Sequence, residues 1–235
     1  MKWFFAKYYE FKTRFFDSYH LRYKNKSKSL KNVLQQSGKT RWMDMGSSVS
    51  FTENFFFADL YPIEEAKPEI KDRYFQFNAT EDLSDELASK MGKFDLIRMQ
   101  HVYEHFTPEQ GEIALKNCHS LLKDDGYILI TVPDLKIFVE RYKRNCLDTS
   151  WTFTDWAETR IEKGAPQSYY FSIFTHSVLY QSHHWCYDEA GLIYALEKTG
   201  LFKDIKRLSL FDELAEIPFT HNRAWEDLCI LARKK

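Results

Sequence analysis

The sequence predicts an α/β protein, doubly wound, with a mostly parallel sheet. Three observations lead to this fold class. Segments typical of strands alternate along the chain with segments of helical periodicity, which is the pattern of βαβ units. Residues 127–132 (YILITV) form a nearly continuous apolar run, as in a strand that is buried on both faces of a sheet. The 235 residues suffice for one domain with a single core.

The first half of the chain supplies four predicted strands and two predicted helices. A helix is predicted over Asp82–Met91, because its apolar residues recur at four-residue spacing. A second helix is predicted over Pro108–Leu122, where Thr107 can cap the helix and proline suits its first position. The strand candidates are short, apolar and followed by polar or turn residues: Arg41–Met45, Phe55–Leu60, Tyr74–Phe77 and Phe94–Gln100.

The second half continues the alternation of strands and helices. A run of residues without a clear period, 136–182, holds many aromatic side chains, so we expect an insertion or lid over the strand ends. We divide the chain into residues 1–39, a basic, aromatic helical segment, and residues 40–235, the α/β domain. The remaining predicted elements are a turn, a strand, a helix and two late strands: Asp124–Gly126, Tyr127–Val132, Asp188–Thr199, Phe202–Ser209 and Asp227–Ala232.

The composition excludes several classes of protein. A charged fraction of 29% and an aromatic fraction of 17% exclude a disordered or collagen-like chain. The net charge of −1 gives no reason to expect a nucleic acid as partner. The sequence holds no apolar run long enough to span a membrane. The four cysteines are widely spaced, without a CxxC pair, so we expect reduced thiols and a cytoplasmic location.

The amino-terminal segment is strongly basic. Residues 1–43 hold eleven Lys and Arg and two acids, a local charge of +9. Aromatic residues recur there at spacings that suit an amphipathic helix. Two interpretations stay open: a helix on an anionic membrane or acidic partner, and a helix packed on the domain with its basic face in water. We favour the packed helix, with peripheral membrane contact through residues 1–24 as the alternative.

Polar residues follow each predicted strand, at the position where open α/β sheets bind their ligands. Their recurrence, strand after strand, is more informative than any single residue. The candidate binding residues, in strand order, are Asp44, Gly46 and Ser47, then Asp59, then Asn78 and Ala79, then Gln100 and His101.

The residue types suit a nucleoside ligand. Gly46 permits a tight turn and a close approach of the backbone to a ligand. A carboxylate at Asp59 can accept hydrogen bonds from both hydroxyls of a ribose. At Asn78, an amide carbonyl can accept from an adenine amino group, while the backbone N–H of Ala79 donates to the ring.

Five motifs in order, DMGSS, FFFADLYP, FNATEDL, FDLIRMQHVYEHF and LLKDDGYILITVPDL, resemble the class I S-adenosylmethionine-dependent methyltransferases. The stretch HHWCYDEAGLIYALEKTGLF also resembles a bacterial branch of that family. The resemblance covers roughly residues 40–135 and 183–205. It implies a Rossmann-like, seven-stranded sheet with S-adenosylmethionine across its carboxyl edge.

The resemblance also implies a role for the candidate residues. Asp44 and Gly46 would flank the methionine part of the cofactor, Asp59 would bind the ribose, and Asn78 with Ala79 would bind the adenine.

The resemblance also places Gln100 and His101, and the sequence differs from the family pattern at three points. Gln100 and His101 would lie near the amino-acid end and the methyl group of the cofactor. The first loop has fewer glycines than the family pattern, and Asn78 stands where Asp is more usual. Only twelve residues separate Gly46 from Asp59, so the usual first helix must be a turn or absent.

Histidines are the candidate catalytic groups, because a hydroxyl acceptor benefits from a general base with a pKa near neutrality. We prefer His101 by location, with His183 as the alternative base or as a residue that orients the acceptor. His183, His184 and Cys186 could be imagined as metal ligands, but there is no second cluster at ligand spacing, so we expect no metal site. Glu104 is expected only to hold its loop.

The expected function is that of a cytoplasmic, S-adenosylmethionine-dependent O-methyltransferase that acts on a small-molecule or sugar-containing acceptor, as in polysaccharide biosynthesis. Two alternatives stay open: a methyltransferase for a phosphate-like or carboxylate oxygen, and a non-catalytic nucleotide-binding scaffold of the same fold. A nicotinamide dehydrogenase is less compatible, because no GxGxxG follows the first strand. Cations that could hold an anionic acceptor are Lys136, Arg141, Lys143 and Arg144. Arg98, inside a strand, is expected to be a structural ion-pair partner.

Overall fold

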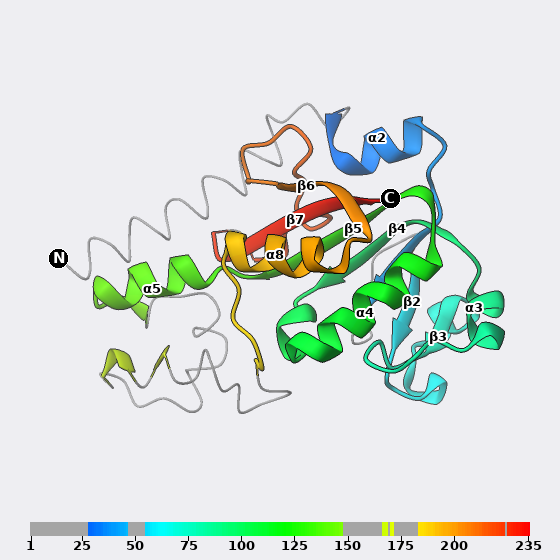
Figure 1. The fold of residues 1–235 in the computed structure, drawn as a ribbon, viewed down its shortest axis with the longest axis horizontal. Helices are drawn as coiled ribbons and strands as arrows, with labels where there is room; N and C mark the ends of the chain where they lie inside the picture. Colours follow the sequence, from blue (N-terminus) through cyan, green and yellow to red (C-terminus); the bar gives the residue numbers. More distant parts are fainter. Residues whose placement is uncertain (1–27, 47–54, 148–165, 169, 172–182, 224) are drawn as a thin grey trace.

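The computed structural model describes residues 28–46, 55–147, 166–168, 170–171, 183–223 and 225–235. These residues form a seven-stranded sheet with the strand order β3-β2-β1-β4-β5-β7-β6 (Figure 1). Strands β1 to β5 pair in parallel, and β7 is antiparallel to both of its neighbours. The predicted doubly wound, mostly parallel sheet is confirmed.

The strands lie close to their predicted positions, with one correction. Residues Asp124–Gly126 were predicted to be a turn, but they lie within β5. Asp125 has a φ of 57°, and the register between β4 and β5 shifts between Phe94 and Leu96, so these residues form an irregularity inside the strand. The strands are β1 Trp42–Met45, β2 Phe55–Asp59, β3 Tyr74–Gln76, β4 Phe94–Gln100, β5 Leu122–Pro133, β6 Phe202–Arg207 and β7 Asp227–Lys234.

The predicted cap of α4 is confirmed, helix α3 begins three residues later than predicted, and helix α5 has bounds that were not predicted. Thr107 and Gln110 form a reciprocal capping box at the start of α4. Helix α5 lies in the segment that showed no period, and the side chain of Asp134 caps it. The helices are α2 Leu30–Gln36, α3 Asp85–Met91, α4 Pro108–Leu121, α5 Leu135–Lys143 and α8 Glu189–Thr199, with 3-10 turns η2 Ile63–Glu65, η3 Pro68–Arg73 and η4 Tyr103–His105.

Helices α3, α4 and α8 cover one face of the sheet, as Figure 1 shows. The apolar face of each helix packs on alternate residues of the parallel strands, which excludes water from both surfaces. This first core includes Met43, Met45, Met91, Ile97, Met99, Leu115, Ile128, Ile130, Leu192 and Leu196.

The opposite face is covered by α2 and by the chain between β6 and β7. The backbone N–H of Leu30 donates to the carbonyl of Leu214 at 2.9 Å, so α2 is tied to that connection. Residues 1–27, including the predicted aromatic helix, lie outside the described residues, as do 148–165 and 172–182 of the expected lid. This second core includes Leu30, Leu34, Trp42, Phe55, Phe57, Leu96, Leu129 and Phe219.

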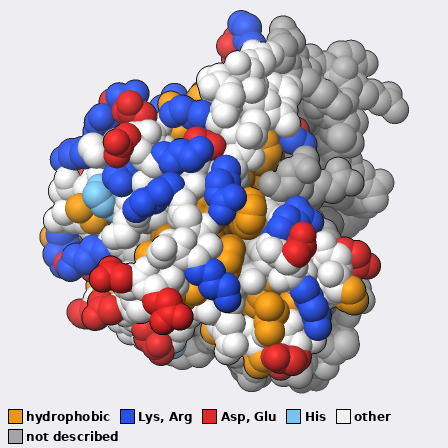
Figure 2. Space-filling model, turned by 90° about the vertical axis from the view of Figure 1, so that its right-hand side faces the viewer, with side chains coloured by type: hydrophobic (Ala, Val, Ile, Leu, Met, Phe, Trp, Pro, Cys, Tyr) orange, Lys and Arg blue, Asp and Glu red, His pale blue; other side chains and the backbone are white. Residues whose placement is uncertain are grey.

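Two lysine side chains donate hydrogen bonds to backbone carbonyls of β5 at the amino edge of the sheet. This edge lies opposite the candidate site. Nζ of Lys39 donates to the carbonyl of Asp125 at 2.6 Å, and Nζ of Lys234 donates to the carbonyl of Leu122 at 2.8 Å. Figure 2 shows a face where Lys and Arg are interspersed with Asp and Glu around exposed hydrophobic side chains. Within the described ranges, no helix is long and apolar enough to cross a membrane.

Candidate active site

Gly46 ends β1 in a conformation that requires glycine for two reasons. Its φ is +75°, which is in the left-handed region, and its N–H donates to the carbonyl of Ala58 at 2.7 Å. A Cβ at this position would lie 2.6 Å from both methyl carbons of Val102, which follows β4. The neighbouring Ser47 lies outside the described residues.

The Asp44 side chain forms an ion pair with Arg98 on the side of the sheet that faces the second core. Its carboxylate is buried and accepts from Nε of Arg98 at 3.0 Å and from Nη2 at 2.5 Å. Arg98 also donates to the carbonyl of Phe219 at 3.2 Å, which holds the chain after β6 against the sheet. The structural role predicted for Arg98 is confirmed. Both oxygens of the Asp44 carboxylate accept hydrogen bonds from the Arg98 guanidinium.

Asp59 is the last residue of β2, and its side chain is buried. Oδ1 accepts from the N–H of Leu60 at 2.7 Å, and the Asp59 carbonyl accepts from the N–H of Phe77 at 2.7 Å. Asp59 is therefore held at the strand end by nearby backbone. An ionised carboxylate only accepts hydrogen bonds, so its chemistry is compatible with hydroxyl donors.

Asn78 closes the turn after β3 with its own side chain. Its Oδ1 accepts from the N–H and the hydroxyl of Thr80 at 3.1 and 2.9 Å, and its Nδ2 donates to Glu81 at 2.9 Å. The carbonyl of the buried Ala79 accepts from Nδ2 of Asn117 in α4 at 2.9 Å. Hydrogen bonds within the turn and from Asn117 in α4 thus hold the turn in place. The turn follows the carboxyl end of β3.

His101 follows β4 and lies between two buried carboxylates. Its backbone has a φ of +57°. Nε2 lies 3.0 Å from Oδ1 of Asp227, and Nδ1 lies 3.3 Å from Oε1 of Glu104. Burial by itself lowers the pKa of His101, but Asp227 and then Glu104 outweigh it and raise the pKa to about 9. The base expected to titrate near neutrality is therefore a cation at neutral pH. Next to it, Nε2 of Gln100 donates to the carbonyl of Pro218 at 3.0 Å.

Asp227 is a site residue that sequence reasoning missed. Its Oδ2 accepts from the N–H groups of Asn222 and Arg223 at 2.8 and 2.6 Å, while Oδ1 faces His101. Asp227 begins β7, and because β7 is antiparallel, its first residue lies at the edge where the parallel strands end. The residues of this strand do not encode its antiparallel direction, so the sequence alone did not indicate Asp227.

Glu104, His105 and His183 form a cluster beside His101. Each contributes one polar atom, and these atoms all lie within 4.8 Å of one another. The rings of His105 and His183 have centroids 5.0 Å apart, and the N–H of Trp185 donates to the Glu104 carbonyl at 3.1 Å. This cluster differs from the His183, His184 and Cys186 grouping considered from the sequence, since it excludes the exposed His184.

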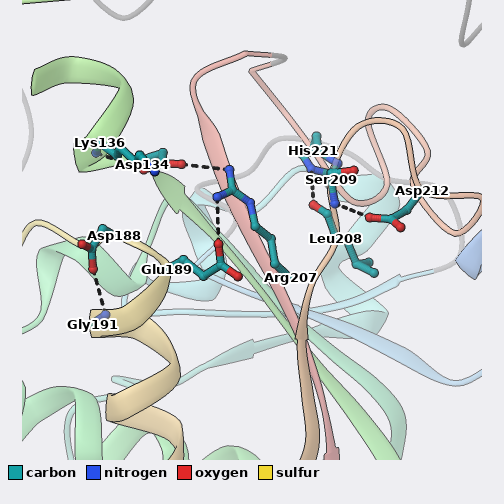
Figure 3. A network of polar contacts seen from close by, with 10 residues as sticks. All are labelled: Asp134, Lys136, Asp188, Glu189, Gly191, Arg207, Leu208, Ser209, Asp212 and His221. Carbon is teal, nitrogen blue, oxygen red and sulfur yellow. Dashed lines mark hydrogen bonds and ion pairs between the residues drawn. The ribbon is translucent and has the colours of Figure 1, made fainter. Parts of the chain in front are cut away.

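Arg207, at the end of β6, contacts carboxylates at the starts of two helices (Figure 3). It contacts Oδ2 of Asp134 at 2.9 Å and Oε2 of Glu189 at 3.0 Å, so it joins the starts of α5 and α8. Burial raises the pKa of Asp134, and Arg207 opposes that rise. Arg207 thereby holds the starts of α5 and α8 next to the end of β6.

The chain matches the methyltransferase domain family over residues 18–202. No curated protein matches it significantly. A solved S-adenosylmethionine-dependent methyltransferase from Clostridium acetobutylicum has the same fold, with a TM-score of 0.52, 11% identity and coverage of 96% of this chain and 98% of that one.

Two other solved structures are similar. A candidate O-methyltransferase of Nostoc punctiforme has a TM-score of 0.50 and 16% identity, and the match covers 89% of this chain and 56% of that chain. Magnesium protoporphyrin IX methyltransferase of Synechocystis, with bound SAH, has a TM-score of 0.47 and 11% identity, covering 95% and 83% of the two chains.

Proposed function

This chain belongs to the methyltransferase domain family and is an S-adenosylmethionine-dependent enzyme, and we propose that it methylates an oxygen of a small-molecule or sugar-containing acceptor. The observation that carries the proposal is the cluster of Glu104, His105 and His183 at the carboxyl end of β4. A hydroxyl acceptor must lose a proton, and an imidazole can take it near neutral pH.

The residues at the ends of β1, β2 and β3 would hold the cofactor. S-adenosylmethionine supplies the methyl group as a sulfonium. We assign the ribose hydroxyls to Asp59 and the adenine to the backbone around Asn78 and Ala79. Gly46 would let the methionine part approach the backbone, with Asp44 contributing main chain, because its carboxylate binds Arg98. Ser47 and Gln100 complete this set as proposed neighbours of the methionine part.

On the acceptor side, we assign proton acceptance to His183 and a positioning role to His101. Both ring nitrogens of His101 face carboxylates, so neither is directed to an acceptor hydroxyl. His183 is partly exposed and is brought to the edge by the bond between Trp185 and Glu104. These contacts reverse the preference for His101 as the base.

The alternative acceptor, a phosphate-like or carboxylate oxygen, has less support. Arg141 is buried and forms an ion pair with Glu226, so its guanidinium is engaged inside the fold. Lys143 lies 3.1 Å from Glu140 on the same helix. Two of the cations expected to hold an anionic acceptor are thus bound to other carboxylates.

Location and partners stay proposals from the sequence. We propose a cytoplasmic enzyme that acts on a glycan precursor or another small molecule, without a nucleic-acid partner. A peripheral membrane contact through residues 1–24 is open to a direct test: salt-sensitive binding to anionic liposomes supports the contact, and binding that is absent at low salt contradicts it.

The proposed function is tested by measuring S-adenosylmethionine binding and then methyl transfer to three groups of acceptors: hydroxyl-bearing, phosphate-bearing and carboxylate-bearing. We expect transfer to a hydroxyl. His183→Ala should lower the rate by about 10²–10⁴-fold, while the adjacent exposed variant His184→Ala keeps it. Transfer only to anionic oxygens, or equal rates in the two variants, would contradict the proposal.

A further inference from the structure

We propose that Glu104, His105 and His183 form a binding site for a divalent transition-metal cation. Their polar atoms lie within 4.8 Å of one another. A cation with bonds of about 2.1 Å holds neighbouring ligand atoms about 3–3.5 Å apart. The ligand atoms that lie farthest apart therefore need to approach by up to about 1.5 Å, which side-chain rotations supply.

The carboxylate of Glu104 is a second, independent observation. Its side chain is 3% exposed, and neither oxygen makes a hydrogen bond within the described part of the chain. Oε1 lies 3.3 Å from Nδ1 of His101, which is an ion-pair distance. The other ring nitrogen of His101, Nε2, forms an ion pair with Asp227. His101 thus supplies a counter-charge to Oε1, whereas Oε2 has neither a hydrogen bond nor an ion pair among the residues that the structure describes. A buried carboxylate oxygen is costly unless it is paired or coordinates a metal, so Oε2 is the oxygen that suits a cation.

The fold brings the three ligands together from two segments. The turn η4 places Glu104 and His105 side by side. The rings of Tyr103 and Tyr187 have centroids 5.4 Å apart, and the N–H of Trp185 donates to the Glu104 carbonyl, so the segment that carries His183 is docked on η4. The site thus rests on packed backbone, which limits the movement needed to bind an ion.

The donor set indicates the class of metal. Two imidazoles and one carboxylate suit Zn²⁺, Mn²⁺, Fe²⁺ or Co²⁺, whereas Mg²⁺ and Ca²⁺ prefer oxygen ligands. Three protein ligands leave coordination positions for water or substrate, as in catalytic rather than structural sites.

The catalytic consequence rests on the proposed function. The cluster lies where an acceptor hydroxyl is expected, and a bound cation would hold the acceptor oxygen and lower the pKa of its hydroxyl. With a cation bound, the role of His183 as a metal ligand replaces the proton acceptance assigned to it above, and the acceptor proton passes to solvent.

The test uses the full chain after treatment with a chelator. Calorimetric titration with Zn²⁺, Mn²⁺ and Mg²⁺ gives affinities, and the visible spectrum of Co²⁺ reports imidazole coordination. We expect one equivalent of Zn²⁺ to bind with micromolar or tighter affinity, and Mg²⁺ to bind at least about 100-fold more weakly.

Variants assign the ligands. His183→Ala and Glu104→Gln should each weaken Zn²⁺ binding by at least about 100-fold, and His184→Ala should leave it unchanged. Circular dichroism checks the fold, and His183→Ala, at a partly exposed position, keeps the test valid if the buried variant Glu104→Gln unfolds.

Two outcomes overturn the proposal: no binding of Zn²⁺, Mn²⁺ or Co²⁺ at 1:1 stoichiometry, or equal affinities in His183→Ala and His184→Ala. Full methyl transfer by the metal-free enzyme overturns the catalytic consequence. Binding of S-adenosylmethionine to metal-free protein is measured in parallel, so that failure of the proposed function is recognised separately from failure of the metal site.

Discussion

The two halves of the carboxyl edge are built by different means. At the ends of β1, β2 and β3, the cofactor half, the side chains of Asp59 and Asn78 are held by residues within their own turns. At the ends of β4 and β5 and the start of β7, the acceptor half, charged side chains hold one another, and His101 contacts Asp227 from 126 residues away. We infer that changes in the cofactor half affect binding locally, whereas changes in the acceptor half affect the whole fold.

The largest effect is expected from Asp227→Asn. The change leaves the partly buried His101 cation without its main counter-charge, the fully buried Asp227 carboxylate, so the free energy of unfolding should fall by about 3 kcal/mol in urea titration. The matched control is Asp125→Asn, on the amino edge, whose exposed carboxylate lies 3.5 Å from Lys203. The control should cost less than about 1 kcal/mol. Equal losses would remove the contrast between buried and exposed charge.

Asp59→Ala probes the cofactor half. Loss of a charged hydrogen-bond acceptor should weaken S-adenosylmethionine binding by about 2–3 kcal/mol, or about 30–150-fold, by calorimetry. Glu64→Ala, an exposed carboxylate in the following turn, is the control and should bind like wild type. Wild-type affinity in a folded Asp59→Ala protein would exclude Asp59 from the ribose site.

Gly46→Ala probes the contact between the halves, because the added Cβ would meet Val102 at 2.6 Å. The left-handed backbone and the overlap together should lower stability by about 2 kcal/mol. Gly38 has a similar φ of +73° with nothing near its Cβ, so Gly38→Ala isolates the backbone cost, about 1 kcal/mol. Adding Val102→Ala to Gly46→Ala should recover part of the difference, and no recovery would mean that Val102 is not the obstacle.

The smallest effect on stability is expected from His119, which lies at the amino edge of the sheet. Burial, with Lys234 and Lys93, lowers its pKa below the ordinary 6.5. The unfolded chain therefore binds the proton more readily, and the contribution of His119 to stability is present above pH 6.5 and is lost as the pH falls below that value. The melting temperature should drop less between pH 7.5 and 5.5 in His119→Gln than in wild type. Identical drops would show that His119 does not contribute.

The strands and the long helices could be predicted because local patterns determine them. The apolar run 127–132 and the proline after Thr107 are signals within one segment. The bounds of helix α5 could not be predicted because its nine residues bury few apolar side chains, Phe138 among them. Its position depends on long-range contacts such as the buried ion pair of Arg141 with Glu226.

The candidate site divides in the same way. Asp59 could be recognised because it follows a strand, and in a parallel sheet all strand ends meet at one edge. Asp227 could not, since its position at that edge depends on β7 running antiparallel, which the residues of the strand itself do not encode. The raised pKa of His101 depends on that same long-range contact.

The separation of the two halves is tested most directly by measuring S-adenosylmethionine affinity and single-turnover methyl transfer in Asp59→Ala and His183→Ala. Asp59→Ala should bind the cofactor about 30–150-fold more weakly. His183→Ala should bind it within about twofold of wild type and lose methyl transfer by about 10²-fold or more. Equal loss of cofactor affinity in both variants, or methyl transfer at the wild-type rate in His183→Ala, would contradict the separation.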